Sequence, residues 1–242
     1  MKYIKRIGLI VPGSNTTIES DFRLVLPQNI TVHSTRICTP PGIESEEIVD
    51  IFNSKVEDAA KCLAKSKIDI ISYGFTTGSF YRGIDYNNQL IEKIEKVSGL
   101  KAITPSTAIL KALNKLNAKN VSIVTPYPEW NNKMFLNYLE DTDYNVLKLE
   151  GDKRSAEEAI KSPMWHQEPE SILEFILNID HSGADVLLCP CTAWRTVEII
   201  EILERELKIP VITANQASMW EVLSTLGFQK NIKGYGRLLE LA

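Results

Sequence analysis

Short apolar runs alternate with longer amphipathic segments along the whole chain. The clearest helical pattern begins near Ser45, has two glutamates in its first turn, and carries apolar residues at spacings of three and four as far as Leu63. Strands and helices that alternate in this way build parallel βαβ units with right-handed crossovers and helices on both faces of the sheet. The predicted strands are 4–11, 30–38, 68–74, 100–103, 121–125, 144–149, 185–189 and 211–213, and the predicted helices are 17–26, 45–63, 80–97, 105–116, 129–139, 170–180, 193–207 and 216–226.

The second half of the chain repeats the first in the order of its elements and in their positions. Val11-Pro12 can be laid against Thr125-Pro126, Phe75-Thr76 against Cys191-Thr192, and Ile103-Thr104 against Ile212-Thr213, at a nearly constant offset of about 110 residues. We therefore predict an α/β fold of two pseudo-symmetric Rossmann-like (flavodoxin-like) parallel-sheet halves, with the active site in the cleft between them. The predicted halves are 1–116, joined by the C-terminal segment 214–242, and 117–213. Chance echoes between βαβ units are the alternative to a duplication.

Cys191 follows an apolar strand pattern and precedes a helical one. At such a position a thiol faces unpaired backbone N–H groups and the positive end of a helix dipole, which lower a thiol pKa. Cys191 is therefore a candidate reactive thiol, although a buried and inert cysteine is an equally common outcome. At the equivalent position of the first half stands Phe75, whose phenyl ring can neither accept a proton nor attack a carbon atom.

Hydroxyl and amide side chains gather around the same strand ends. Thr76, Thr77 and Ser79 offer hydroxyls at a predicted helix start, which can hold a carboxylate but can also serve only as helix caps. Tyr127 lies between two prolines, which stiffen its backbone, so its hydroxyl is a candidate donor, although a buried tyrosine in a turn is also common. The predicted cleft is lined by residues 12–15, 75–79, 127 and 191–192, with Pro12 and Asn15 at the end of the first strand.

Composition narrows the classes of partner and cofactor. The net charge of −4 argues against a nucleic-acid or anionic membrane surface, and no apolar run approaches the roughly 20 residues that cross a bilayer. We read no signal peptide at the amino terminus and expect a cytoplasmic protein. Neither a GxGxxG nor a Walker A motif follows a strand, and neither the four cysteines nor the three histidines have metal-site spacing, so we expect no cofactor and no metal.

Several motifs resemble the aspartate/glutamate racemase superfamily over nearly the whole chain, and within it the branch of maleate cis-trans isomerase and arylmalonate decarboxylase. The segment from Gly8 to Thr17 resembles the opening of the maleate isomerases, and Asn15 matches the asparagine that binds a substrate carboxylate there. The segments 79–83, 106–110 and 234–238 are more similar to the decarboxylase. The resemblance implies a small carboxylate as substrate, and it leaves a homodimer open.

The resemblance also implies a mechanism with two thiols on opposite sides of the reacting carbon, and these map to Cys191 and to the position of Phe75. The decarboxylase likewise lacks the first thiol, having glycine there, and keeps the second as proton donor. We therefore predict a cofactor-independent decarboxylase that passes through an enediolate, with Thr76, Thr77, Tyr127 and the backbone N–H of Thr192 as oxyanion donors. A cis-trans isomerase or racemase and a non-catalytic dicarboxylate binder are the alternatives. The roles of Arg154, Trp165, His166, Trp194 and Arg195 stay open.

Overall fold

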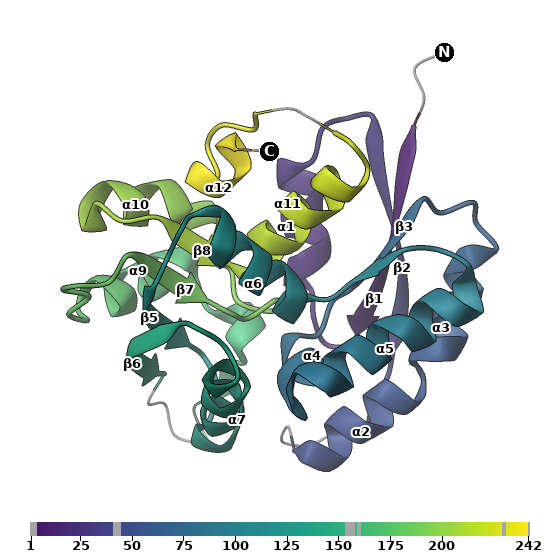
Figure 1. Ribbon diagram of the computed structural model, residues 1–242, viewed down its shortest axis with the longest axis horizontal. Coiled ribbons are helices and arrows are strands. Elements are labelled where there is room, and N and C mark those ends of the chain that lie inside the picture. Colours follow the sequence, from purple (N-terminus) through teal and green to yellow (C-terminus); the bar gives the residue numbers. More distant parts are fainter. Residues whose placement is uncertain (1–3, 41–44, 153–157, 159–160, 229–230, 242) are drawn as a thin grey trace.

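Two parallel sheets of four strands each form the framework of the molecule (Figure 1). The computed structural model describes residues 4–40, 45–152, 158, 161–228 and 231–241. The first sheet has the order β2-β1-β3-β4 and the second the order β6-β5-β7-β8, so the two sheets share one topology. The strands are β1 (Lys5–Pro12), β2 (Ile30–Ile37), β3 (Ile70–Tyr73), β4 (Ala102–Ile103), β5 (Asn120–Thr125), β6 (Asn145–Gly151), β7 (Val186–Cys189) and β8 (Val211–Thr213).

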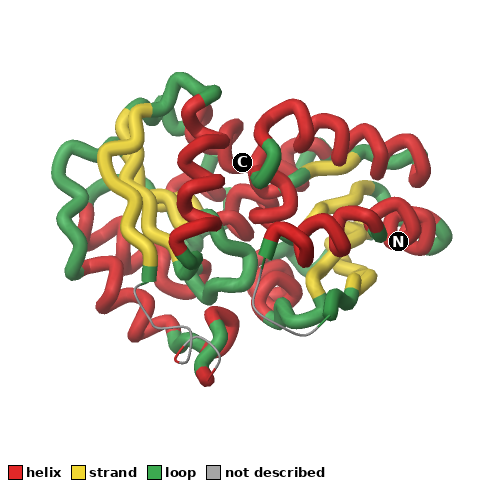
Figure 2. The backbone as a smooth tube through the Cα atoms, turned by 90° about the horizontal axis from the view of Figure 1, so that it is seen from below, coloured by secondary structure: helices red, strands yellow, loops and turns green. Residues whose placement is uncertain are grey.

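Helices cover both faces of the sheets and fill the space between them. Figure 2 shows the strands in two groups on either side of the molecule, with helices around and between them. The helices are α1 (Thr17–Val25), α2 (Glu46–Ser54), α3 (Val56–Ala64), α4 (Thr76–Phe80), α5 (Gly83–Ser98), α6 (Pro105–Lys115), α7 (Glu129–Glu140), α9 (Pro169–Leu177), α10 (Ile200–Leu207), α11 (Ala214–Thr225) and α12 (Arg237–Glu240), with single 3₁₀ turns η1 (Met164–His166) and η2 (Val197–Ile199).

The predicted fold class is confirmed. β1 and β5 are central strands, and each pairs in parallel with strands on both of its sides. Their side chains are almost completely buried, as expected for parallel strands that are covered on both faces. Because the strands of each sheet are parallel, their carboxyl ends meet at one edge, where open α/β sheets bind their ligands.

Three predicted helices differ from the observed ones. The predicted helix 45–63 is divided at Lys55, whose Nζ donates a hydrogen bond to the carbonyl of Cys38 (2.9 Å), while the apolar periodicity runs on across the break. The predicted helix 80–97 begins at Gly83 as α5, and the residues before it form a separate short helix, α4. The predicted helix 193–207 begins only at Ile200, after the turn η2. The short helix α12 had no predicted counterpart.

The predicted division of the chain at residues 116 and 213 remains a prediction. Its basis in the structure is that α11, from the carboxyl-terminal part of the chain, packs against α6 and α1. Thr213 caps α11 through a reciprocal pair of hydrogen bonds with Gln216, which fixes where this helix leaves β8. In the part of the chain that is described, no helix has the length and apolar character needed to cross a membrane.

Candidate active site

A cavity lies where the carboxyl ends of strands from both sheets face one another. Its volume is about 20 Å³. A second, larger hollow of about 380 Å³ adjoins it and shares with it Pro12, Ser14, Phe75 and Trp165. The first cavity is lined by Pro12, Ser14, Asn15, Phe75, Thr76, Thr77, Tyr127, Met164, Trp165, Cys191, Thr192 and Ala193.

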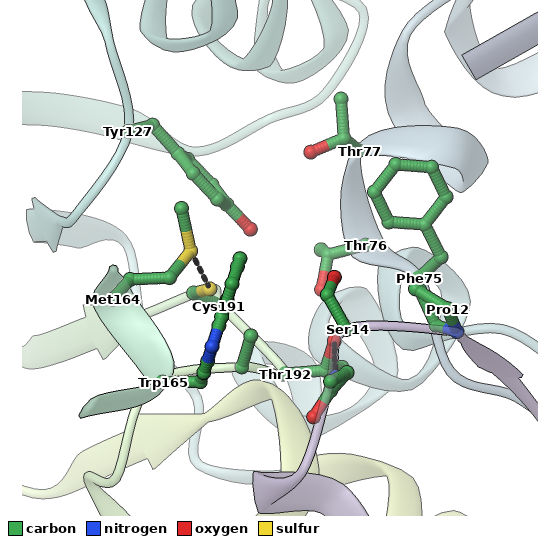
Figure 3. A pocket seen from close by; sticks show the side chains of 12 residues that line it. Pro12, Ser14, Phe75, Thr76, Thr77, Tyr127, Met164, Trp165, Cys191 and Thr192 are labelled. Atoms are coloured by element: carbon green, nitrogen blue, oxygen red, sulfur yellow. Dashed lines mark hydrogen bonds between the residues drawn. The ribbon is translucent and has the colours of Figure 1, made fainter. Parts of the chain in front are cut away.

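Cys191 lies on one wall of this cavity, two residues after the end of β7. Its side chain is 3% exposed. The Sγ–H group donates to the Sδ atom of Met164 at 3.5 Å, and Met164 comes from the turn η1 (Figure 3). A thioether sulfur can only accept a hydrogen bond, so the thiol is the donor in this contact when it carries its proton, and that is the form that a proton donor needs.

The segment after Cys191 is an irregular turn and not the start of a helix. Trp194 is 1% exposed and donates from Nε1 to Oε1 of Gln167 at 2.6 Å, while the carbonyl of Trp194 accepts from the N–H of Thr196 at 2.8 Å. The buried indole and its hydrogen bond to Gln167 hold the backbone of this segment in a conformation that is not helical. The expectation that a helix dipole acts on Cys191 from this segment was therefore wrong.

Phe75 lies on the opposite side of the cavity from Cys191 (Figure 3). Its ring packs edge-on against Phe52, with 4.9 Å between the ring centroids. Gly78 makes room for this arrangement, because a Cβ atom at that position would approach the Phe75 ring to 2.7 Å and the Tyr73 hydroxyl to 2.0 Å. The phenyl ring is therefore built into the aromatic core of the first half and is not an isolated replacement.

Thr76 and Thr77 offer hydroxyl groups to the cavity from the first turn of α4. The Oγ1 atom of Thr76 is buried and has no hydrogen-bond partner. The Oγ1 atom of Thr77 accepts a bond from the Nδ2 atom of Asn131 at 3.0 Å, and an amide nitrogen can only donate. The hydrogen of the Thr77 hydroxyl therefore remains available to an acceptor in the cavity.

Asn15 caps the amino-terminal end of α1. Its Oδ1 accepts from the N–H groups of Thr17 and Ile18 at 3.0 and 3.1 Å, and the Thr16 side chain makes no capping bond. The Nδ2 atom donates to Thr192 Oγ1 at 3.3 Å. An amide NH₂ group has two hydrogens, so the cap orients Asn15 with one more donor at the cavity wall.

Thr192 and Tyr127 line the cavity, but their hydroxyls are bonded to the chain itself. The hydroxyl of Thr192 donates to the carbonyl of Gly74 at 3.0 Å, across the two halves. The hydroxyl of Tyr127 donates to the carbonyl of Pro190 at 2.8 Å. These bonds fix the segment that carries Cys191. Because the hydroxyl of Thr192 is engaged, only its backbone N–H could serve as the predicted donor.

Ser79 is the predicted pocket residue that the structure does not bring to the cavity wall. It is fully buried and hydrogen-bonded to the carbonyl of Thr76 (2.7 Å) and to the hydroxyl of Ser106 (2.6 Å), so it supports α4 from behind. Ser14 lines the cavity and belongs to the predicted stretch 12–15. Met164 and Ala193 also line it and were not predicted, and Trp165 was named without a role. Only the neighbourhood of Cys191 pointed to Ala193, and no pattern marked Met164.

The remaining candidates lie outside the cavity wall. His166 is exposed and touches the ring of Trp165, and Arg195 pairs with Glu168 and Glu198. Arg154 lies outside the described residues. Burial raises the pKa of the Cys189 thiol, so this neighbour of Cys191 remains protonated and lies in the sheet. The described residues contain no group of three or more histidine, cysteine or carboxylate side chains that could hold a metal ion.

Comparisons with known proteins match nearly the whole chain. The family model of arylmalonate decarboxylase matches residues 7–239. A maleate isomerase of Pseudomonas putida is 25% identical over 99% of this chain and 98% of its own length. The arylmalonate decarboxylase of Bordetella bronchiseptica is 25% identical over 97% of this chain and 96% of its own.

Solved structures match over the same extent. The crystal structure of the maleate isomerase Iso from Pseudomonas putida S16 superposes with a TM-score of 0.89 at 23% identity and covers 98% of both chains. The structure of unliganded arylmalonate decarboxylase gives a TM-score of 0.83 at 24% identity, over 98% of this chain and 100% of its own. At this level of identity the likeness concerns the fold.

Proposed function

The chain belongs to the arylmalonate decarboxylase family, in the branch of the aspartate/glutamate racemase superfamily that also holds the maleate isomerases, and from that membership we propose its reaction. The enzyme removes carbon dioxide from a small substituted malonate without a cofactor, and Cys191 is the proton donor. The alternative in the same family is isomerisation or racemisation of a small carboxylate.

One observation carries the choice of reaction. Among the described residues that line the cavity, Cys191 supplies a thiol on one wall, and the opposite wall presents the phenyl ring of Phe75. A racemase must remove a proton on one face of a carbon and return it on the other, so it needs a proton-transfer group on each face. Decarboxylation needs a proton on one face only.

The proposed reaction has two steps, loss of carbon dioxide and protonation of the central carbon. The bond between the central carbon and one carboxylate breaks, carbon dioxide leaves, and the electron pair enters the remaining carboxylate as an enediolate. The central carbon then takes the proton of the Cys191 Sγ–H group, and the thiolate regains a proton from water. Donors that meet the growing charge stabilise the transition state, and the hydroxyls of Thr76 and Thr77 with the amide of Asn15 are placed for that role.

The shape of the site supports a malonate with a modest substituent. Phe75 and Trp165 narrow the cavity, and the neighbouring hollow is lined by Ile48 and Phe52 together with polar residues such as Ser14 and Thr39. In the proposed arrangement the carboxylate that remains lies in the cavity, and the substituent points to Ile48 and Phe52. Bulky aryl groups are expected to turn over more slowly than small alkyl groups.

The test is a turnover assay in heavy water with methylmalonate and phenylmalonate. We expect release of carbon dioxide and one deuteron on the α-carbon of the product, with both signals lost in Cys191→Ala. Cys62→Ser removes an exposed thiol from α3 and is the matched control, which should turn over normally. Undiminished release of carbon dioxide by a folded Cys191→Ala variant would refute the proposed role of the thiol.

The isomerase alternative rests on the relatives that carry the name maleate isomerase. It predicts conversion of maleate to fumarate, or exchange of an α-proton without loss of carbon dioxide. Tight binding of a dicarboxylate with neither reaction would identify a binding protein. A homodimer and a cytoplasmic location remain part of this proposal, and sedimentation and cell fractionation test them.

A further inference from the structure

The main chain around Cys191 is held by side chains from distant parts of the sequence. The Nδ2 atom of Asn215, in the first turn of α11, donates to the carbonyl of Thr192 at 3.0 Å. The hydroxyl of Thr17, at the start of α1, donates to the carbonyl of Ala193 at 3.1 Å. Two consecutive carbonyls of the reactive segment therefore have partners outside that segment.

Asp21 sets the orientation of Asn215. The same Nδ2 atom donates to Oδ2 of Asp21 at 2.7 Å, so both hydrogens of the amide are directed at oxygen acceptors. The Oδ1 atom of Asn215 is buried and has no partner, which costs free energy. The amide is thus oriented for its two acceptors, although this orientation leaves its own oxygen unsatisfied.

The carboxyl group of Asp21 lies in a setting that disfavours charge. Asp21 is 3% exposed, and its pKa is raised to about 7. Burial is the main cause of this raised pKa and Glu198 adds to it, while the hydrogen bond from Asn215 and the positive charge of Arg195 lower the pKa. A carboxyl group that is almost fully buried and poised near neutral pH is typical of functional sites.

Other charged groups on the elements that pack against α1 are engaged elsewhere. Arg36 of β2 pairs with Glu19, which lies two positions before Asp21 and so on the other side of the helix. His33 of β2 is exposed and bonded to Thr31, and Glu221 of α11 pairs with Lys111. The state of Asp21 therefore depends mainly on its burial and on Asn215, with smaller effects from Glu198 and Arg195.

We propose that Asp21 and Asn215 are positioning residues, which hold the carbonyl of Thr192 and thereby keep Cys191 in place for the reaction. This inference rests on the proposed function for its kinetic consequence, but the contact itself does not depend on which substrate is turned over. An ionised Asp21 gives Asn215 a charge-assisted partner, which is the stronger kind of hydrogen bond. Protonation of Asp21 weakens that bond, so the reactive segment is held less firmly below neutral pH.

The test compares variants that remove the contact with one that keeps it. Asp21→Leu and Asn215→Ala remove the acceptor or the donor, whereas Asp21→Asn keeps an oxygen acceptor without a charge. Asn87→Ala is the matched control, because Asn87 is another buried asparagine, and its side chain is bonded to Thr104 and Thr107 and not to the segment that carries Cys191. Two quantities are measured for each variant: kcat and KM against pH, and the rate at which iodoacetamide alkylates Cys191, followed by peptide mass spectrometry.

We expect Asp21→Leu and Asn215→Ala to lower kcat by roughly tenfold to a hundredfold with little change in KM, because the thiol and not the binding groups is displaced. Alkylation of the buried Cys191 should become faster in both. Asp21→Asn, which is uncharged at every pH, should show the lower kcat that the natural protein has below neutral pH and should lose the acid limb of the pH profile. Asn87→Ala should match the natural protein in both measurements.

Alkylation in Asp21→Leu and Asn215→Ala at the rate of the natural protein would overturn the proposal. If Asp21→Leu fails to fold, Asn215→Ala and Asp21→Asn decide the question. If the natural protein turns over no malonate, the proposed reaction is wrong, while the alkylation rates still test whether the contact holds Cys191.

Discussion

The segments after β3 and after β7 occupy equivalent places in two sheets of the same topology, yet they are built differently. After β3 the chain enters α4 at once, packs Phe75 against Phe52, and leaves the hydroxyls of Thr76 and Thr77 ready for a ligand. After β7 it forms an irregular turn whose carbonyls and side chains are bonded to other elements. The segment after β3 therefore has hydroxyl groups that are available to a ligand, whereas the segment after β7 is fixed by hydrogen bonds to other elements.

The largest expected effect comes from moving the thiol between the two segments. Cys191→Ala should lower kcat by roughly 10²-fold to 10⁴-fold, since a positioned proton donor is lost. Adding Phe75→Cys to that variant should restore part of the activity and give a product of the opposite hand, because the proton then arrives on the other face. The substrate for this test is a malonate with two different substituents, such as methylphenylmalonate, whose product has a stereogenic α-carbon, and chiral chromatography of that product measures its hand. A restored product of the same hand would contradict the equivalence of the two positions.

Asp21→Asn should change stability in a way that depends on pH. The folded pKa of Asp21 is about 7 and its ordinary value is 3.8, so the natural fold loses stability as pH rises through this interval. The variant lacks that loss and should be more stable near pH 8, by roughly 4 kcal/mol at most, with a much smaller difference near pH 4. Urea denaturation at both pH values checks this prediction, and equal differences at both would contradict the raised pKa.

Thr77→Val should remove one hydroxyl donor from the segment after β3 without moving the Cys191 thiol. Loss of one donor to a developing oxyanion typically lowers kcat by about 10²-fold. The fold should tolerate the change, although Asn131 loses an acceptor. Steady-state kinetics measure the effect, with Thr142→Val as the control, because Thr142 has a similar local hydroxyl bond far from the cavity. Equal rates for both variants would exclude Thr77 from the reaction.

The smallest effect is expected from Arg36→Ala. Nη1 of Arg36 bonds to the carbonyls of Pro12, Gly13 and Asn15 at 3.3, 3.2 and 2.9 Å, and so supports the cavity wall of the first half. Its side chain is 37% exposed, so water can replace these bonds, and the cost should stay near 1 kcal/mol or below. We expect a rise in KM of less than about tenfold with kcat unchanged. A decrease in kcat as large as that expected for Asn215→Ala would contradict the expectation that exposed hydrogen bonds to the cavity wall matter less than buried ones.

Much of the fold could be predicted from local patterns in the sequence. Most strands and helices were predicted close to their observed bounds, because apolar periodicity records which face of an element is buried. The repeat of strand ends led to Cys191, Asn15, Thr76, Thr77 and Tyr127, which do meet at one cavity. The helix predicted after Cys191 was wrong because the turn is held by Trp194 and Gln167, a contact that no local pattern records.

The sequence by itself determined the α/β architecture, the family, and the fact that a thiol stands on one strand end and a phenyl ring on its counterpart. These depend on residue type and spacing, which are properties of the chain. Only the tertiary structure decided which hydroxyls are free to bind a ligand and which are bonded to the protein, as for Thr77 and Thr192. It alone brought Asp21, Asn215 and Thr192 together, because a hydrogen bond depends on the positions of atoms that the chain order leaves far apart.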